Sequence, residues 1–165
     1  MEVEKLYAFS AACIERQRLR ERGKCVVLTN GCFDLLHPGH MHLLSQAATF
    51  GDSLWVALNS DDSVRQLKGP TRPIYGETLR AFTLGSLRVV DGIFLFDGKN
   101  VVEEIKKFSP DVYVRAADRT LQDLDSKELQ ALRNVGARIE FVNFLPNFST
   151  TRIVQHIADV VTKEP

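Results

Sequence analysis

Hydrophobic and polar residues follow two different periodicities along the chain, and together they predict a regular series of strands and helices. Five continuous apolar runs have the length and composition of strands that are buried on both faces of a sheet. These runs are residues 25–30, 53–60, 92–96, 111–116 and 137–144. Apolar residues at helical spacing predict amphipathic helices before, between and after them. The predicted helices are residues 3–21, 40–50, 78–90, 101–109, 125–136 and 149–161.

The alternation of strands and helices predicts an α/β fold. Short apolar strands joined by amphipathic crossovers give a five-stranded parallel sheet with helices on both faces, a Rossmann-like arrangement. The 165 residues suit one domain, 1–165, with a leading helix in 1–23 and an α/β core in 24–161. Residues 67–77 contain two prolines and two glycines, which predicts a polar loop.

Composition narrows the possible partners and the compartment. The 21 basic and 21 acidic residues cancel, so charge gives no indication of a nucleic-acid partner. No apolar run approaches the roughly 18 residues needed to span a bilayer, and the amino-terminal segment lacks the order of a secretory signal. The three cysteines contain no CxxC pair. We therefore expect a cytoplasmic protein without a nucleic-acid or membrane partner.

Polar residues follow the predicted strands, where parallel sheets bind their ligands. They include Asn30, Asn59 to Asp61, Asp97 and Arg115 to Asp118. The glycine-rich fingerprints GxGxxG and GxxxxGK[ST] are both absent. If the domain binds a nucleotide, a different device must hold its phosphates.

The segment GCFDLLHPGH, residues 31–40, is the strongest candidate for that device. A zinc site is disfavoured because His42 points away from His40 on the predicted helix and no further ligand motif is present. A Cys32 nucleophile lacks an evident orienting pair. An isolated HxxH most often means one capping and one packed histidine.

A phosphate-binding interpretation fits the segment better. Gly31 allows close approach of the backbone to a ligand, and Pro38 begins a helix whose N-terminal amides favour an anion. His37 and His40 are one turn apart and would point at that anion. As imidazolium ions they would neutralise charge on a bridging oxygen and a leaving phosphate.

The segment GCFDLLHPGH resembles the GxFDxxHxGH signature of the cytidylyltransferase-like nucleotidyltransferases. The stretches ALNSDDSVRQLKGPTRP, LGSLRVVD and STTRI occur in the same order in the branch of D-glycero-D-manno-heptose 1-phosphate nucleotidyltransferases, and the similarity covers nearly all of residues 1–160. That branch makes activated heptose for lipopolysaccharide or surface glycans. The resemblance implies attack of a sugar-phosphate oxygen on the α-phosphorus of a nucleoside triphosphate, with release of pyrophosphate. It also implies Mg²⁺ with the triphosphate and a homodimer.

The resemblance assigns roles to residues of this chain. The implied catalytic residues are His37, His40 and Lys68. The implied nucleotide-binding residues are Asn30, Gly31, Cys32, Phe33, Asp118, Ser149, Thr150 and Thr151. The implied substrate-binding residues are Asn59, Asp61, Arg72, Arg80, Arg88 and Arg115. Asp34 is expected to bond backbone amides, a structural role more than a functional one.

Two features leave alternatives open. Arg88 is typical of the glycerol-3-phosphate branch, so a cytidylyltransferase for glycerol 3-phosphate or another small phosphate is the first alternative. Residues 114–119 read VRAADR where heptose relatives have VKGGDY, and 96–100 read FDGKN where they have an acidic stretch. A catalytically weak nucleotide-binding regulatory module is the second alternative. The choice between ATP and CTP also remains open.

Overall fold

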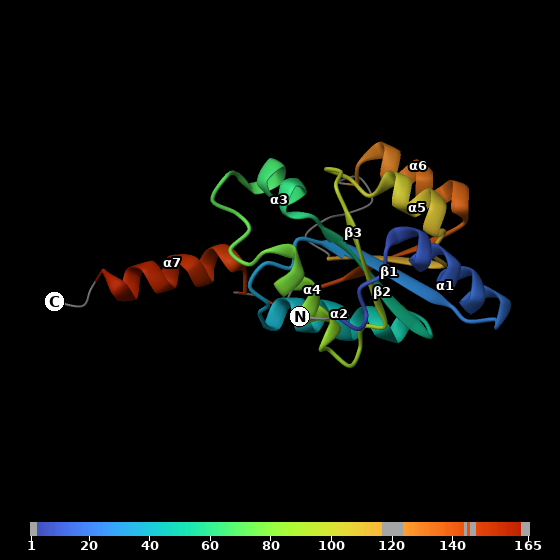
Figure 1. Ribbon diagram of the computed structural model, residues 1–165, viewed down its shortest axis with the longest axis horizontal. Helices are drawn as coiled ribbons and strands as arrows, with labels where there is room; N and C mark the ends of the chain where they lie inside the picture. Colours follow the sequence, from blue (N-terminus) through green and yellow to red (C-terminus); the bar gives the residue numbers. More distant parts are fainter. Residues whose placement is uncertain (1–2, 117–123, 144, 146–147, 163–165) are drawn as a thin grey trace.

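The predicted sheet is present in full in the structure, a computed structural model that describes residues 3–116, 124–143, 145 and 148–162 (Figure 1). All five strands run parallel, in the order β3-β2-β1-β4-β5. They are β1 (Val26–Gly31), β2 (Ser53–Asn59), β3 (Gly92–Phe96), β4 (Val112–Ala116) and β5 (Arg138–Val142). The α/β fold predicted from the apolar runs is confirmed.

Helices cover both faces of the sheet, as predicted (Figure 1). They are α1 (Phe9–Glu21), α2 (Pro38–Ala47), α3 (Asp61–Lys68), α4 (Glu77–Gly85), α5 (Val102–Phe108), α6 (Ser126–Val135) and α7 (Thr150–Val161). Helices α1, α5 and α6 bury their apolar residues with Trp55 and Phe94 on one face. Helices α2 and α4 pack with Leu54 and Val56 on the other face. Alternate residues of each strand therefore feed two separate cores.

The structure differs most from the sequence-based prediction in helices α1, α3 and α4. Helix α1 begins at Phe9, because the preceding residues run beside the edge strand: the Tyr7 amide donates to the carbonyl of Ile93 at 2.8 Å. Helix α3 was not predicted; Ser60 caps it by accepting from the Ser63 amide. Lys68 thus ends a helix and does not lie in a loop. The helix predicted over 78–90 ends at Gly85.

The strand order reverses beside β1, and this places the ligand site. From β1 the chain proceeds to β2 and β3 on one side, and then returns to β4 and β5 on the other. Parallel sheets bind ligands in the crevice at such a switch point, outside the carboxyl ends of the strands. Helix α7 begins near that edge and extends away from the body of the molecule (Figure 1). Among the described residues, no helix is both long enough and apolar enough to cross a membrane.

Candidate functional site

A cavity of about 280 Å³ lies at the carboxyl end of β1; we call it the first cavity. The loop after β1, the start of α2, the end of α3 and the start of α7 converge on it. Its lining includes Asn30, Gly31, Cys32, Phe33, Asp34, His37, His40, Lys68, Ser149, Thr150 and Thr151. The catalytic residues implied by the resemblance all line this cavity. The implied nucleotide-binding residues that the structure describes also line it. Asp118 lies outside the described residues.

The two histidines of the HPGH turn stack on each other. His37 is the N-cap of α2, and its ring centroid lies 3.8 Å from that of His40, with the planes inclined by 23°. Glycine at position 39 leaves room for the His37 ring, because a Cβ there would lie 3.0 Å from it and would require the ring to shift. The Nδ1 atoms of both histidines are buried and have no hydrogen-bond partner among the described residues. Both imidazoles therefore retain hydrogen-bonding capacity for a ligand in the cavity.

Burial and neighbouring charged groups of the protein favour the neutral form of both histidines at neutral pH. Burial lowers the pKa of His37, and the nearby Lys68 ammonium lowers it further. Burial, followed by the neighbouring His37 and Lys68, lowers the pKa of His40 from 6.5 to about 3. Two adjacent rings beside a cation disfavour a further positive charge, so the imidazolium ions expected beside an anion would need the added negative charge of that ligand.

Cys32 is not an activated nucleophile. Burial raises the pKa of its thiol, and the opposing effects of Lys68 and Arg80 do not overcome that rise. A thiol with a raised pKa is protonated at neutral pH and reacts poorly. The site therefore offers no evidence for the thiol mechanism considered from sequence.

Asp34 ties the loop after β1 to the loop between α3 and α4. Its carboxylate is 1% exposed and accepts hydrogen bonds from the amides of Ile74 and Tyr75 and from Arg72 Nη1, all at 3.0 to 3.1 Å. Burial alone would raise the pKa of Asp34, but these three donors outweigh it and leave the pKa below its ordinary value. The structural role expected for Asp34 fits this geometry, although its amide donors come from a distant loop.

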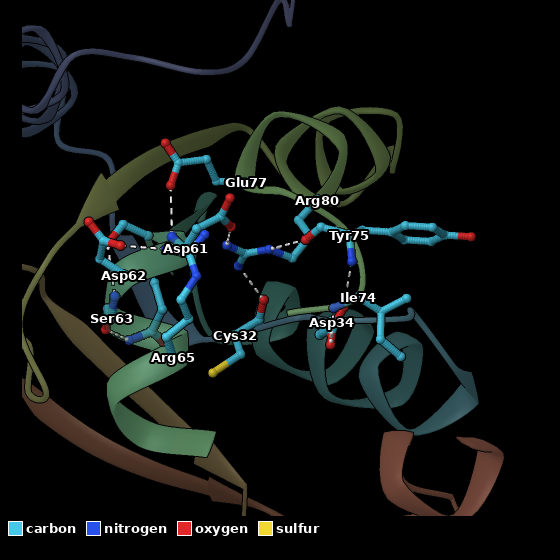
Figure 2. Close-up of polar contacts among 12 residues, drawn as sticks. Cys32, Asp34, Asp61, Asp62, Ser63, Arg65, Ile74, Tyr75, Glu77 and Arg80 are labelled. Atoms are coloured by element: carbon cyan, nitrogen blue, oxygen red, sulfur yellow. Dashed lines mark hydrogen bonds and ion pairs between the residues drawn. The ribbon is translucent and has the colours of Figure 1, made fainter. Parts of the chain in front are cut away.

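Arg80 joins three segments beneath the cavity (Figure 2). Its guanidinium is 1% exposed and donates to the carbonyls of Tyr75 at 2.9 Å and Cys32 at 2.6 Å. It also forms an ion pair with Asp61 at 2.8 Å. Figure 2 shows the Arg80 side chain between these three acceptors. We call Asp34, Asp61, Arg72 and Arg80 the buried hub.

The start of α7 is held over the same loop. Ser149 caps the helix by accepting from the Arg152 amide at 3.2 Å, as its position predicted. The Thr150 hydroxyl donates to the carbonyl of Asp34 at 2.7 Å. The N-termini of α2 and α7 therefore open onto one cavity, and both helix dipoles favour an anion there.

A second cavity of about 500 Å³ lies beside the first and shares Lys68 with it. Its polar lining includes Asn30, Asn59, Lys68, Lys99, Asn100, Arg115, Asp125 and Glu128. Arg115 donates to the Asn30 side-chain oxygen at 2.6 Å, which also accepts from the Tyr113 hydroxyl at 2.8 Å. Asn59 and Arg115, two of the implied substrate-binding residues, thus lie together.

The other implied substrate-binding residues, Asp61, Arg72, Arg80 and Arg88, line neither cavity. Asp61 and Arg80 are paired with each other, and Arg72 is bonded to Asp34. Arg88 is exposed in the turn that leads into β3, at the amino end of the parallel strands. The site therefore lies at the opposite edge of the sheet from Arg88, the residue that suggested glycerol 3-phosphate.

Sequence reasoning missed five polar residues of the second cavity: Thr29, Lys99, Asn100, Asp125 and Glu128. Lys99 and Asn100 follow β3 closely, so their position after a strand was an available signal. Asp125 was predicted only as a helix cap, a role it fills by accepting from the Lys127 amide at 2.8 Å. Among the described residues, no three His, Cys, Asp or Glu side chains gather to form a metal site.

Comparisons with known proteins agree with this geometry. Residues 28–156 match the sequence model of the family described as cytidylyltransferase-like. The chain is 45% identical over 145 residues to the bifunctional protein HldE of Geotalea uraniireducens, and 46% identical over 133 residues to that of Gluconobacter oxydans. These alignments cover 88% and 81% of this chain but only 29% and 27% of the relatives. The chain thus spans less than a third of their length.

A solved structure shares the fold. The lipopolysaccharide core biosynthesis protein from Thermoplasma volcanium GSS1 superimposes with a TM-score of 0.60 at 29% sequence identity. The match covers 74% of this chain and 98% of that one. With the family signature in the HPGH turn and the family match over most of its length, this chain belongs to the cytidylyltransferase-like family.

Proposed function

We propose that this chain transfers a nucleoside monophosphate from a nucleoside triphosphate to a sugar phosphate of the heptose 1-phosphate type. An oxygen of the acceptor phosphate attacks the α-phosphorus, the bond between that phosphorus and the oxygen bridging to the β-phosphate breaks, and pyrophosphate leaves. The observation that carries the proposal is the first cavity, where two helix N-termini, Lys68 and two imidazole nitrogens without a hydrogen-bond partner in the described part of the chain converge. The similarity to HldE proteins supports the sugar-phosphate acceptor.

The residues of the cavity act mainly by positioning and by stabilising charge. The N-terminus of α2 and Lys68 bind phosphate oxygens. The negative charge of the triphosphate raises the pKa of a nearby imidazole. His37 and His40 then gain protons as the triphosphate binds and stabilise the charge that develops on the bridging oxygen.

Magnesium would accompany the triphosphate. Both oxygens of Asp34, the carboxylate that lines the first cavity within the described part of the chain, already accept hydrogen bonds. The described residues thus offer Mg²⁺ no carboxylate cage at this cavity. The ion fits only as one carried by phosphate oxygens, which is its usual state beside nucleotides. The steps above therefore rest on the side chains alone.

Pyrophosphate release tests the proposal directly. Each of ATP, CTP, GTP and UTP is paired, with Mg²⁺, with heptose 1-phosphate, glucose 1-phosphate or glycerol 3-phosphate. We expect turnover with one nucleotide and with heptose 1-phosphate, and the same nucleotide should raise the melting temperature most. A nucleotide that stabilises the protein while no pair releases pyrophosphate would instead identify a binding or regulatory module.

A further inference from the structure

The second cavity carries a mixture of hydrogen-bonding groups. Lys99 and Arg115 only donate, Asp125 and Glu128 only accept, and Asn100 can do both. A phosphate group only accepts and would be repelled by carboxylates. Sugar hydroxyls donate and accept at the same atom, so they match this mixture. The lining therefore fits the hydroxyl-bearing body of a ligand better than a second phosphate.

Two of these polar groups are buried and held in place. Glu128 is 4% exposed and accepts from the Val101 amide at 3.1 Å. Asn59 is 3% exposed and donates to the Ser63 hydroxyl at 2.8 Å, which in turn donates to the carbonyl of Gly98 at 2.7 Å. Burial of a carboxylate with a single amide partner is costly unless another group satisfies it. The second cavity therefore has polar groups that the fold already holds in position for a ligand.

The same bonds fix the loop that carries Lys99. The loop is held at Gly98 by Ser63 and at Val101 by Glu128, and Lys99 and Asn100 lie between these two points. Both residues line the second cavity. Lys99 has no hydrogen bond or ion pair with another described residue, so its ammonium is available to a ligand.

We propose that Glu128 and Lys99 set the acceptor specificity by binding hydroxyl groups of the sugar. Lys68 lines both cavities, so the reacting phosphate lies there and the sugar extends into the second cavity. Glu128 accepts from one hydroxyl and Lys99 donates to another. The inference rests on the proposed function and adds the basis of its selectivity. The hydroxyls of glycerol 3-phosphate lie on a three-carbon chain close to its phosphate, so with that phosphate at Lys68 we expect them to reach neither Glu128 nor Lys99.

The test compares Glu128→Gln and Lys99→Met with the wild type in steady-state kinetics. A glutamine keeps the carbonyl oxygen that Val101 needs, so the fold should be retained. For each variant we expect KM for heptose 1-phosphate to rise about 10-fold or more, the usual effect of losing a hydrogen bond to a charged group. KM for the nucleotide and the kcat/KM for glycerol 3-phosphate should stay within about 2-fold of wild type, because neither uses these groups.

Glu103→Gln and Lys107→Met are matched controls, because both residues are exposed on α5 and line neither cavity. They should change neither KM. If the wild type turns over heptose 1-phosphate and both cavity variants keep its KM and its preference over glycerol 3-phosphate, the inference is wrong while the proposed function stands. If the wild type releases no pyrophosphate with any pair, the proposed function is wrong and the inference falls with it.

Discussion

The buried hub and the first cavity are adjacent and rich in polar residues, but they use their hydrogen bonds in opposite ways. In the hub, Arg80 and Asp34 each engage at least three donors or acceptors of the protein itself. In the cavity, the Nδ1 atoms of His37 and His40 have no partner among the described residues. A polar group that is already satisfied stabilises the fold, whereas one left unsatisfied is available to a ligand. The hydrogen bonds thus distinguish the hub residues from the cavity histidines, although the family signature contains residues of both groups.

Removing the centre of the hub should have the largest effect on stability. Arg80→Ala leaves the carbonyls of Cys32 and Tyr75 and the carboxylate of Asp61 without their shared donor. Loss of one partner of a buried ion pair costs about 3–5 kcal/mol. We expect the free energy of unfolding to fall by about 3 kcal/mol, measured by urea unfolding with an unchanged m value. A loss below about 1 kcal/mol would show that Arg80 is not the link between these segments.

Changing the cavity should affect catalysis and leave the fold intact. His40→Ala removes a group that stabilises charge in the transition state, and we expect kcat to fall about 10²-fold or more. Circular dichroism should show a folded protein at the assay temperature. His42→Ala is the control, because His42 lies on the same helix but lines neither cavity. Equal kcat values for the two variants would remove His40 from the mechanism.

The neutral histidines should make the protein sensitive to mild acid. The pKa of His40 is lower in the folded state, so between pH 6.5 and about pH 3 the unfolded chain binds a proton that the folded chain does not. Stability is therefore complete above pH 6.5 and falls as the pH decreases through this range. We expect His40 to cost about 1–2 kcal/mol by about pH 5.

Urea unfolding at about pH 7 and pH 5 measures this effect. The variant His37→Gln/His40→Gln should lose less stability than the wild type, because it lacks both depressed groups. Asp34 does not confound the comparison, since its lowered pKa places its own effect below 3.8. Equal losses in the two proteins would mean that the histidines titrate normally in the folded state.

Much of the fold could be predicted from the sequence, because the strands are continuous apolar runs and they alternate regularly with amphipathic helices. Helix α3 was missed because it is short and mostly polar, and Val64 is its one fully buried apolar residue. The first cavity could also be predicted, because its signal is local in the sequence. Its histidines are close in sequence, and they follow a strand at the edge where ligands bind.

The division between hub and cavity could not be predicted in the same way. Arg72 and Asp34 are 38 residues apart, and Arg80 and Cys32 are 48 residues apart. No local periodicity encodes such pairings, which depend on how two loops pack against each other. Sequence reasoning therefore treated Arg72, Arg80 and Arg88 alike, although the structure places Arg72 and Arg80 in the buried hub and Arg88 on the surface.

Arg88 provides the smallest expected effect and the sharpest contrast with Arg80, eight positions earlier. Its side chain is exposed at the amino edge of the sheet, where it lines neither cavity and forms no hydrogen bond or ion pair with another described residue. Substitutions at such positions usually change stability by less than about 0.5 kcal/mol. Arg88→Ala should therefore leave both the unfolding free energy and kcat/KM for either acceptor at wild-type values. A selective loss of activity would instead place a substrate contact at this edge of the sheet.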